Sequence, residues 1–96
     1  IAPGASTRYF SDADLMSITA PTWIVQAAND TTLPPAVNGL RAHALVPGSL
    51  MSYYDNVTWN GISYPGHWSW IYVARNDPYL DGTHIWQWMA AQRAAV

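Results

Sequence analysis

The chain has 96 residues, of which 50% are hydrophobic and 10% are charged, and its formal net charge is −2. This length suits one small domain spanning residues 1–96, and the lack of a basic surplus argues against nucleic-acid binding or a membrane-surface patch. Without cysteine, disulfides and thiolate sites are excluded, and no apolar run approaches the about 18 residues that span a bilayer.

The surface composition is unusual for a self-contained domain. The charged fraction is far below the usual value of about 25%, and the chain carries six Trp and six Tyr. Part of the surface is therefore expected to be covered by a partner, or the chain is a piece of a larger protein. The opening "IAPGASTRYF" has no initiator Met and lacks the basic-then-apolar form of a signal peptide, so we expect a processed or excised chain.

The first half of the chain predicts a strand, a helix and a second strand. The strand is the apolar, β-branched run "TWIVQAA", Thr22 to Ala28. After the turn "NDTTLPP", helical spacing predicts a helix that starts near Pro35 and stops at Pro47-Gly48. The second strand is "SLMSYYDNV", residues 49–57. A strand, a helix and a strand in this order predict a parallel βαβ unit.

The second half of the chain is expected to be mainly loop and helix. A long loop is predicted from Thr58 to Gly66, followed by a short helix over Trp68 to Arg75 and the turn "NDPYLDG". The last element is predicted as a helix from about Thr83 to Ala95, capped by Asp81 or Thr83. Its expected buried stripe consists of Ile85, Trp88 and Met89.

Two polar side chains follow the two predicted strands. Asp30 comes just past the first strand, and His67 comes after the second strand and its loop. Neighbouring parallel strands end at the same edge of a sheet, where catalytic groups gather in open α/β sheets. We therefore expect Asp30 to accept a hydrogen bond from His67 Nδ1, as in the acid–base half of a Ser-His-Asp triad. The alternatives are that Asp30 only caps a turn or helix and that His67 only fills space among aromatic side chains.

In four segments the chain resembles the C-terminal third of an α/β-hydrolase: "APTWIVQAANDTTLPP", "YYDNV", "GHWSW" and "IWQWMAAQ". It is similar to the esterase and predicted-peptidase branch, which includes polyhydroxybutyrate-depolymerase-like and feruloyl-esterase-like enzymes. The resemblance extends roughly from Pro21 to Gln92. It implies that Asp30 is the triad acid and His67 the triad base. It also implies that Trp68 and Trp70 bind substrate beside the histidine. The order of acid before histidine agrees with this family.

The chain departs from the family at the nucleophile. A hydrolase of this kind needs a G-x-S-x-G elbow upstream of the acid, and this sequence has none. The nearest string is "GASTR", centred on Ser6, which lacks the second Gly and a preceding strand. We therefore expect the nucleophile and the oxyanion-hole donors to come from a missing N-terminal part or from a partner chain. The isolated chain is expected to be inactive.

Neither a metal nor a cofactor is expected. His43 lies in the predicted first helix and His84 begins the last one, and the sequence has no H-x-x-x-H spacing. No nucleic-acid or membrane partner is predicted either. The apolar first strand, "WIVQA", requires a neighbour on each side, so we expect a nucleophile-bearing hydrolase portion or a homo-oligomer to cover its open edge.

The sequence therefore predicts an α/β fold, the C-terminal portion of an α/β-hydrolase with two to three parallel strands and flanking helices. The predicted function is a secreted or periplasmic serine esterase that acts on carboxylic esters. The alternatives are a non-catalytic, aromatic-rich binding module, whose exposed tryptophans stack on sugars or aromatic rings, and an inactive remnant of the hydrolase fold.

Overall fold

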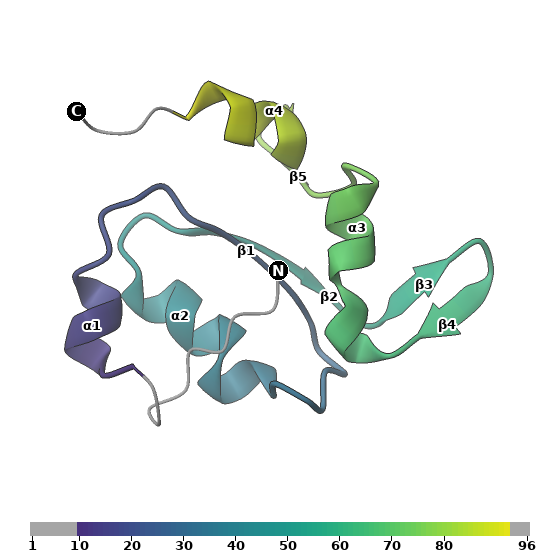
Figure 1. The fold of residues 1–96 in the computed structure, drawn as a ribbon, viewed down its shortest axis with the longest axis horizontal. Coiled ribbons are helices and arrows are strands. Elements are labelled where there is room, and N and C mark those ends of the chain that lie inside the picture. The colour runs from purple at the N-terminus through teal and green to yellow at the C-terminus, as the bar shows by residue number, and fades with distance from the viewer. Residues whose placement is uncertain (1–9, 93–96) are drawn as a thin grey trace.

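The computed structural model describes residues 10–92 (Figure 1). The elements in chain order are α1 (Asp12–Met16), β1 (Trp23–Ala27), η1 (Pro35–Val37), α2 (Gly39–Leu45), β2 (Leu50–Tyr54), β3 (Val57–Trp59), β4 (Ile62–Tyr64), η2 (Gly66–Trp68), α3 (Trp70–Ala74), β5 (Tyr79–Leu80), β6 (Thr83–His84) and α4 (Ile85–Ala91). The two elements written η are single 3₁₀ turns.

The predicted parallel pairing of the first two strands is confirmed. β1 and β2 run side by side, with Trp23 opposite Leu50 and Ala27 opposite Tyr54. All five residues of β1 are buried, because helices pack against both sides of this strand. Ile24 faces α1 and α2 in one apolar cluster, whereas Val25 on the other side packs with α4. This alternation is the period of two expected for a strand.

The predicted fold class is wrong. The described residues contain one parallel pair, β1–β2, and two antiparallel pairs, β3–β4 and β5–β6, as three separate two-stranded sheets. They do not form the parallel core of an α/β-hydrolase. The segment 58–66, predicted as a loop, is mostly the β3–β4 hairpin, which extends away from the rest of the fold beside α3 (Figure 1).

Both hairpins arise from tight turns that the sequence does signal. Asn60 and Gly61 have φ of 55° and 76°, and Asp81 and Gly82 have φ of 50° and 83°. Each pair lies between two strand residues that face each other. Positive φ at both central residues is the type I′ turn, for which Asn-Gly and Asp-Gly are the preferred sequences because their twist suits antiparallel strands. These dipeptides therefore produce antiparallel pairs where a loop and a turn were predicted.

Several helix boundaries also differ from the prediction. The first helix is divided into η1 and α2 at Asn38, and the helix expected from Trp68 begins as η2. Neither Asp81 nor Thr83 caps α4, whose first turn is capped instead by Asn76, since Asn76 Oδ1 accepts from the N–H of Trp86 at 2.8 Å. In the predicted buried stripe of α4, Ile85 is buried and Trp88 is half-buried, but Met89 is exposed.

The short helix α1 was not predicted, although its start has a clear signal. Ser11 Oγ accepts from the N–H of Asp14, and the Asp14 carboxylate accepts in return from the N–H of Ser11. This is a capping box, which satisfies two N–H groups that a helix start leaves free. The hydrogen bonds from the Ser11 backbone and side chain hold the pKa of the Asp14 carboxyl below its usual value.

The stacked pair of Tyr54 and Tyr72 joins β2 to α3, with ring centroids 4.0 Å apart. Burial, together with the Asp77 carboxylate, raises the pKa of Tyr54 to about 12. An unfolded tyrosine has a pKa near 10, so the unfolded state loses this proton first as the pH rises. The contribution of Tyr54 to stability is therefore complete below about pH 10 and is lost as the pH rises towards 12.

We expect the free energy of unfolding of the wild type to fall more steeply between about pH 10 and 12 than that of the variant Tyr54→Phe. Urea denaturation at a series of pH values measures this slope. The matched control is Tyr53→Phe, because Tyr53 is the neighbouring tyrosine of β2 and is exposed. Parallel curves for the wild type and Tyr54→Phe would contradict the expectation.

Candidate functional site

Asp30 lies three residues beyond β1 and is buried. Its Oδ1 accepts hydrogen bonds from the backbone N–H groups of Thr32 at 3.0 Å and Leu33 at 2.9 Å. This is the turn that Asp favours, because a short carboxylate reaches the N–H groups two and three residues ahead. Its Oδ2 accepts from Gln26 Nε2 at 3.0 Å and lies 3.0 Å from His67 Nδ1. The side chain thus both holds the turn and meets the histidine.

His67 lies in η2, directly after the β3–β4 hairpin and Pro65. Its side chain is 38% exposed, whereas the Asp30 side chain is fully buried. A carboxylate only accepts hydrogen bonds, so the contact assigns the proton to Nδ1 and leaves the lone pair of Nε2 unprotonated in the neutral ring. The predicted contact between Asp30 and His67 is confirmed. Their catalytic role stays a prediction.

Close backbone packing brings η2 to the end of β1. A Cβ atom on Gly66 would collide with the main-chain carbon and oxygen of Asn29, the residue before Asp30. Ser69, which is buried, donates from Oγ to the Val25 carbonyl of β1 at 3.4 Å. Glycine at position 66 therefore allows the histidine-bearing turn to approach the acid-bearing turn.

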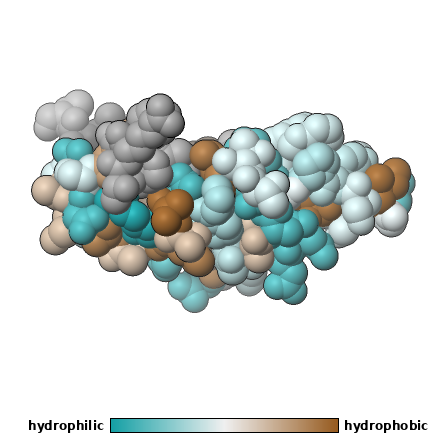
Figure 2. Space-filling model, turned by 90° about the horizontal axis from the view of Figure 1, so that it is seen from below, coloured by the Kyte–Doolittle hydropathy of each residue, from teal (hydrophilic) through white to brown (hydrophobic). Residues whose placement is uncertain are grey.

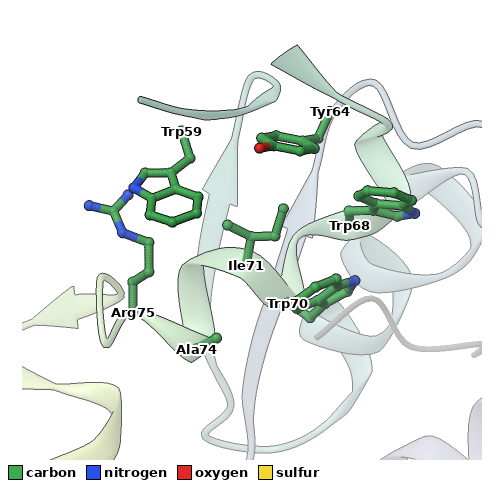
Figure 3. Close-up of a pocket in the computed structure, with 7 residues that line it drawn as sticks. All are labelled: Trp59, Tyr64, Trp68, Trp70, Ile71, Ala74 and Arg75. Atoms are coloured by element: carbon green, nitrogen blue, oxygen red, sulfur yellow. The ribbon is translucent and has the colours of Figure 1, made fainter. Parts of the chain in front are cut away.

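An apolar pocket of about 280 Å³ opens beside the histidine turn. Figure 3 shows the rings of four aromatic residues arranged around Ile71, with two contributed by the hairpin and two by η2 and α3. Its lining residues are Trp59, Tyr64, Trp68, Trp70, Ile71, Ala74 and Arg75. The three tryptophans are all between 41% and 48% exposed, so the pocket offers accessible ring faces to a flat apolar group.

One cation lies at the edge of this pocket. The Arg75 guanidinium is 5.3 Å from the centroid of the Trp59 ring, and it forms an ion pair with Asp77 at 3.3 Å. Figure 3 shows it outside the ring of Trp59, away from Trp68 and Trp70. The interior is therefore apolar, and its one charged lining residue lies at the rim next to the hairpin.

The remaining candidates from the sequence lie elsewhere. His43 contacts Ser49 on the exposed side of α2, and the His84 ring lies tilted by 58° against Tyr79 with ring centroids 5.0 Å apart. Between residues 10 and 92 no group of three or more His, Cys, Asp or Glu side chains could hold a metal ion. Ser6 lies outside the described residues.

Sequence reasoning missed the contact of Gln26 with Asp30 and the placement of Trp59, one of the tryptophans of the binding-module alternative, beside Tyr64. Gln26 is the only polar residue of β1, four positions before Asp30, and that lone amide in an apolar strand was the available signal. Trp59 and Tyr64 lie on either side of the Asn60-Gly61 turn, and recognising the hairpin would have placed them together.

No helix within residues 10–92 is long and apolar enough to cross a membrane. Comparisons with protein-family models, curated proteins and solved structures found no match.

Proposed function

We propose that Asp30 and His67 are the acid and base of a Ser-His-Asp triad that hydrolyses carboxylic esters. The observation that carries this proposal is the 3.0 Å contact between His67 Nδ1 and Asp30 Oδ2, which joins a fully buried carboxylate to a partly exposed imidazole. This arrangement orients the ring and leaves Nε2 as the base. A histidine that only filled space would not need a buried carboxylate behind it.

In the proposed reaction, His67 Nε2 takes the proton of a serine hydroxyl as that oxygen attacks the ester carbonyl. Nε2 then gives the proton to the alkoxide oxygen that leaves as the alcohol, and an acyl-enzyme remains. Water then attacks the acyl carbonyl while Nε2 takes its proton; the bond between the serine oxygen and the acyl carbon breaks, Nε2 returns the proton to the serine oxygen, and the carboxylic acid leaves. Asp30 keeps the ring oriented throughout and stabilises the imidazolium that forms in both halves of the reaction.

The nucleophile is the part of the triad that residues 10–92 do not contribute. Within residues 10–92, the hydrogen bond of the His67 ring goes from Nδ1 to Asp30, and none joins Nε2 to a hydroxyl. We propose that the serine and the oxyanion-hole donors belong to an N-terminal hydrolase portion or to a partner chain that bears the G-x-S-x-G elbow. The partly exposed face of His67 is where such a segment would dock.

The aromatic pocket is the proposed binding site for one apolar part of the ester. Trp68 follows His67 directly, and its ring centroid lies 6.2 Å from that of Trp70. His67 itself does not line the pocket, so we propose that the pocket holds the apolar part of the ester while the ester group extends towards the histidine. Trp68 and Trp70 are accordingly proposed as substrate-binding residues.

The test uses the protein purified from its native source. We expect a serine-directed fluorophosphonate to label one serine, in this protein or in a chain that copurifies with it, and to abolish hydrolysis of p-nitrophenyl acetate. His67→Gln should lower kcat by about 10⁴-fold or more, because it removes the base. His43→Gln, which changes an exposed histidine that contacts Ser49, is the matched control. Hydrolysis that survives His67→Gln, or no labelled serine, would overturn the proposal.

A second candidate is a binding module for flat apolar ligands, and the aromatic pocket itself favours it. Such a module would need its exposed rings but would not need the Asp30–His67 contact. Quenching of tryptophan fluorescence by p-nitrophenol measures binding in the pocket. For a module without chemistry, Trp68→Ala should weaken this binding, no ester should be hydrolysed, and His67→Gln should have no effect on either measurement.

A further inference from the structure

We propose that Gln26 is a positioning residue that holds the Asp30 carboxylate in place for His67. This deepens the function proposed above and rests on it, because it assigns a second supporting group to the same acid–base pair. Gln26 touches neither the reacting atoms nor His67. It acts through Oδ2 of Asp30, the same oxygen that meets His67 Nδ1.

The geometry of the Gln26 amide is determined by its partners. Nε2 donates to Asp30 Oδ2 at 3.0 Å and to the Leu33 carbonyl oxygen at 2.9 Å. Both partners are acceptors, so the amide nitrogen must be the atom that faces them. In the opposite orientation, the amide oxygen would lie against a carboxylate and a carbonyl oxygen. The amide therefore links the Asp30 carboxylate to Leu33, the last residue of the turn that Asp30 holds.

Packing alone does not explain a glutamine at this position. Gln26 is fully buried in a strand whose other four residues are apolar, and within residues 10–92 its Oε1 has no hydrogen-bond partner. Burying a polar atom without a partner is unfavourable, and Leu or Met would fill similar space without that cost. The fold also makes room for the amide, because a Cβ on Gly39 of α2 would collide with Gln26 Oε1.

The four hydrogen bonds to Asp30 have separate effects on its carboxylate. The N–H groups of Thr32 and Leu33 hold Oδ1, but bonds to one oxygen leave the group free to tilt. The bond from Gln26 holds Oδ2 as well, so the carboxylate plane is fixed and Oδ2 points at His67. With Oδ2 in that place, the neutral imidazole keeps its proton on Nδ1. Without Gln26, the carboxylate can tilt away and the proton moves to Nε2, the nitrogen that must act as base.

The test measures the tautomer of His67 by two-bond ¹H–¹⁵N NMR of the imidazole, in the full chain at a pH where the ring is neutral. For Gln26→Met, we expect the ratio of the Nδ1–H to the Nε2–H form to fall about tenfold, the effect of losing a hydrogen bond to a charged group. The matched control is Asn38→Leu. Asn38 is another buried amide whose oxygen has no partner in the described part of the chain, but its Nδ2 donates to the Pro34 carbonyl. Urea denaturation measures the stability of both variants, and only Gln26→Met should change the tautomer.

A second measurement needs no variant and stands even where Gln26→Met does not fold. In the wild type, the side-chain N–H signals of Gln26 should shift along the same titration curve as His67, because both groups bind one oxygen. The N–H signals of Asn38 should not follow that curve. The proposal would be overturned if the chemical shifts of the Gln26 side-chain N–H groups did not change as His67 titrates. It would also be overturned if the tautomer of His67 were unchanged in folded Gln26→Met. Neither measurement depends on ester hydrolysis. The role of Gln26 and the proposed esterase activity can therefore fail independently, and the experiments distinguish the two failures.

Discussion

Asp30→Ala is expected to lower the free energy of unfolding by about 3 kcal/mol, because the buried carboxylate accepts hydrogen bonds from four donors. Alanine would leave the N–H groups of Thr32 and Leu33 without their acceptor, and it would leave a void beside Gln26. Each buried donor without a partner costs about 1–3 kcal/mol. Domains are stable by only about 5–15 kcal/mol, so the variant should unfold at a much lower urea concentration.

Two further variants separate stability from chemistry at this position. Asp30→Asn keeps an acceptor for the turn, but the NH₂ group in place of Oδ2 only donates, so it accepts from neither Gln26 nor His67. We therefore expect a smaller loss of stability than for Asp30→Ala. We also expect kcat of the proposed ester hydrolysis to fall about 10⁴-fold, because His67 would carry its proton on Nε2. Asp55→Ala, at an exposed aspartate, should stay within about 0.5 kcal/mol of the wild type. An Asp30→Ala midpoint in urea equal to that of Asp55→Ala would show that the four hydrogen bonds contribute nothing net.

Gly66→Ala is expected to be the second severe change, with a loss of about 3 kcal/mol and a displaced histidine. The added Cβ would meet the main-chain carbon and oxygen of Asn29, and backbone atoms cannot rotate away as a side chain can. Overpacking of this kind costs about 1–3 kcal/mol or more. Relief requires η2 to move away from β1, and this movement carries His67 away from Asp30. NMR of the His67 ring and urea denaturation measure the two effects.

Gly61→Ala distinguishes this steric effect from the ordinary cost of replacing a glycine. Gly61 has a φ of 76° at the tip of the hairpin, and no atom would lie within 4 Å of an added Cβ. Its replacement should cost about 1–2 kcal/mol through backbone strain, while the His67 signals stay as in the wild type. Equal displacement of His67 in both variants would mean that close contact with Asn29 is not what positions the histidine.

The acid–base contact could be predicted because it depends on strand order. A buried apolar run, a helix and a second strand predict parallel neighbours, and parallel neighbours place Asp30 and His67 at one edge across 37 positions of sequence. The hairpins were equally readable, since Asn60-Gly61 and Asp81-Gly82 are strong turn signals. They were missed because the flanking strands are only two or three residues long, too short to show the alternation that marks a strand.

Other features could not be read from local sequence. The capping of α4 by Asn76 depends on how α3 and α4 pack, because the cap lies ten residues from the N–H that it binds. Asn38 interrupts the predicted first helix with φ −120° and ψ −94°, although nothing in the pattern of apolar residues marks that break. The distribution of apolar residues over the surface could not be read from local sequence either. Figure 2 shows apolar residues scattered among hydrophilic ones on the face seen from below.

The β3–β4 hairpin has a consequence for how this site could diverge during evolution. Its base is anchored, because Val57 is fully buried and the Tyr72 hydroxyl accepts from the N–H of Thr58 and donates to the Asn56 carbonyl. Its tip at Asn60-Gly61 is exposed, yet Trp59 and Tyr64 on its strands line the pocket. Mutations or insertions at the tip can therefore reshape the pocket while the anchored base keeps His67 beside Asp30. Ligand preference can therefore change by mutation while the contact between Asp30 and His67 is kept, so the two properties can evolve independently.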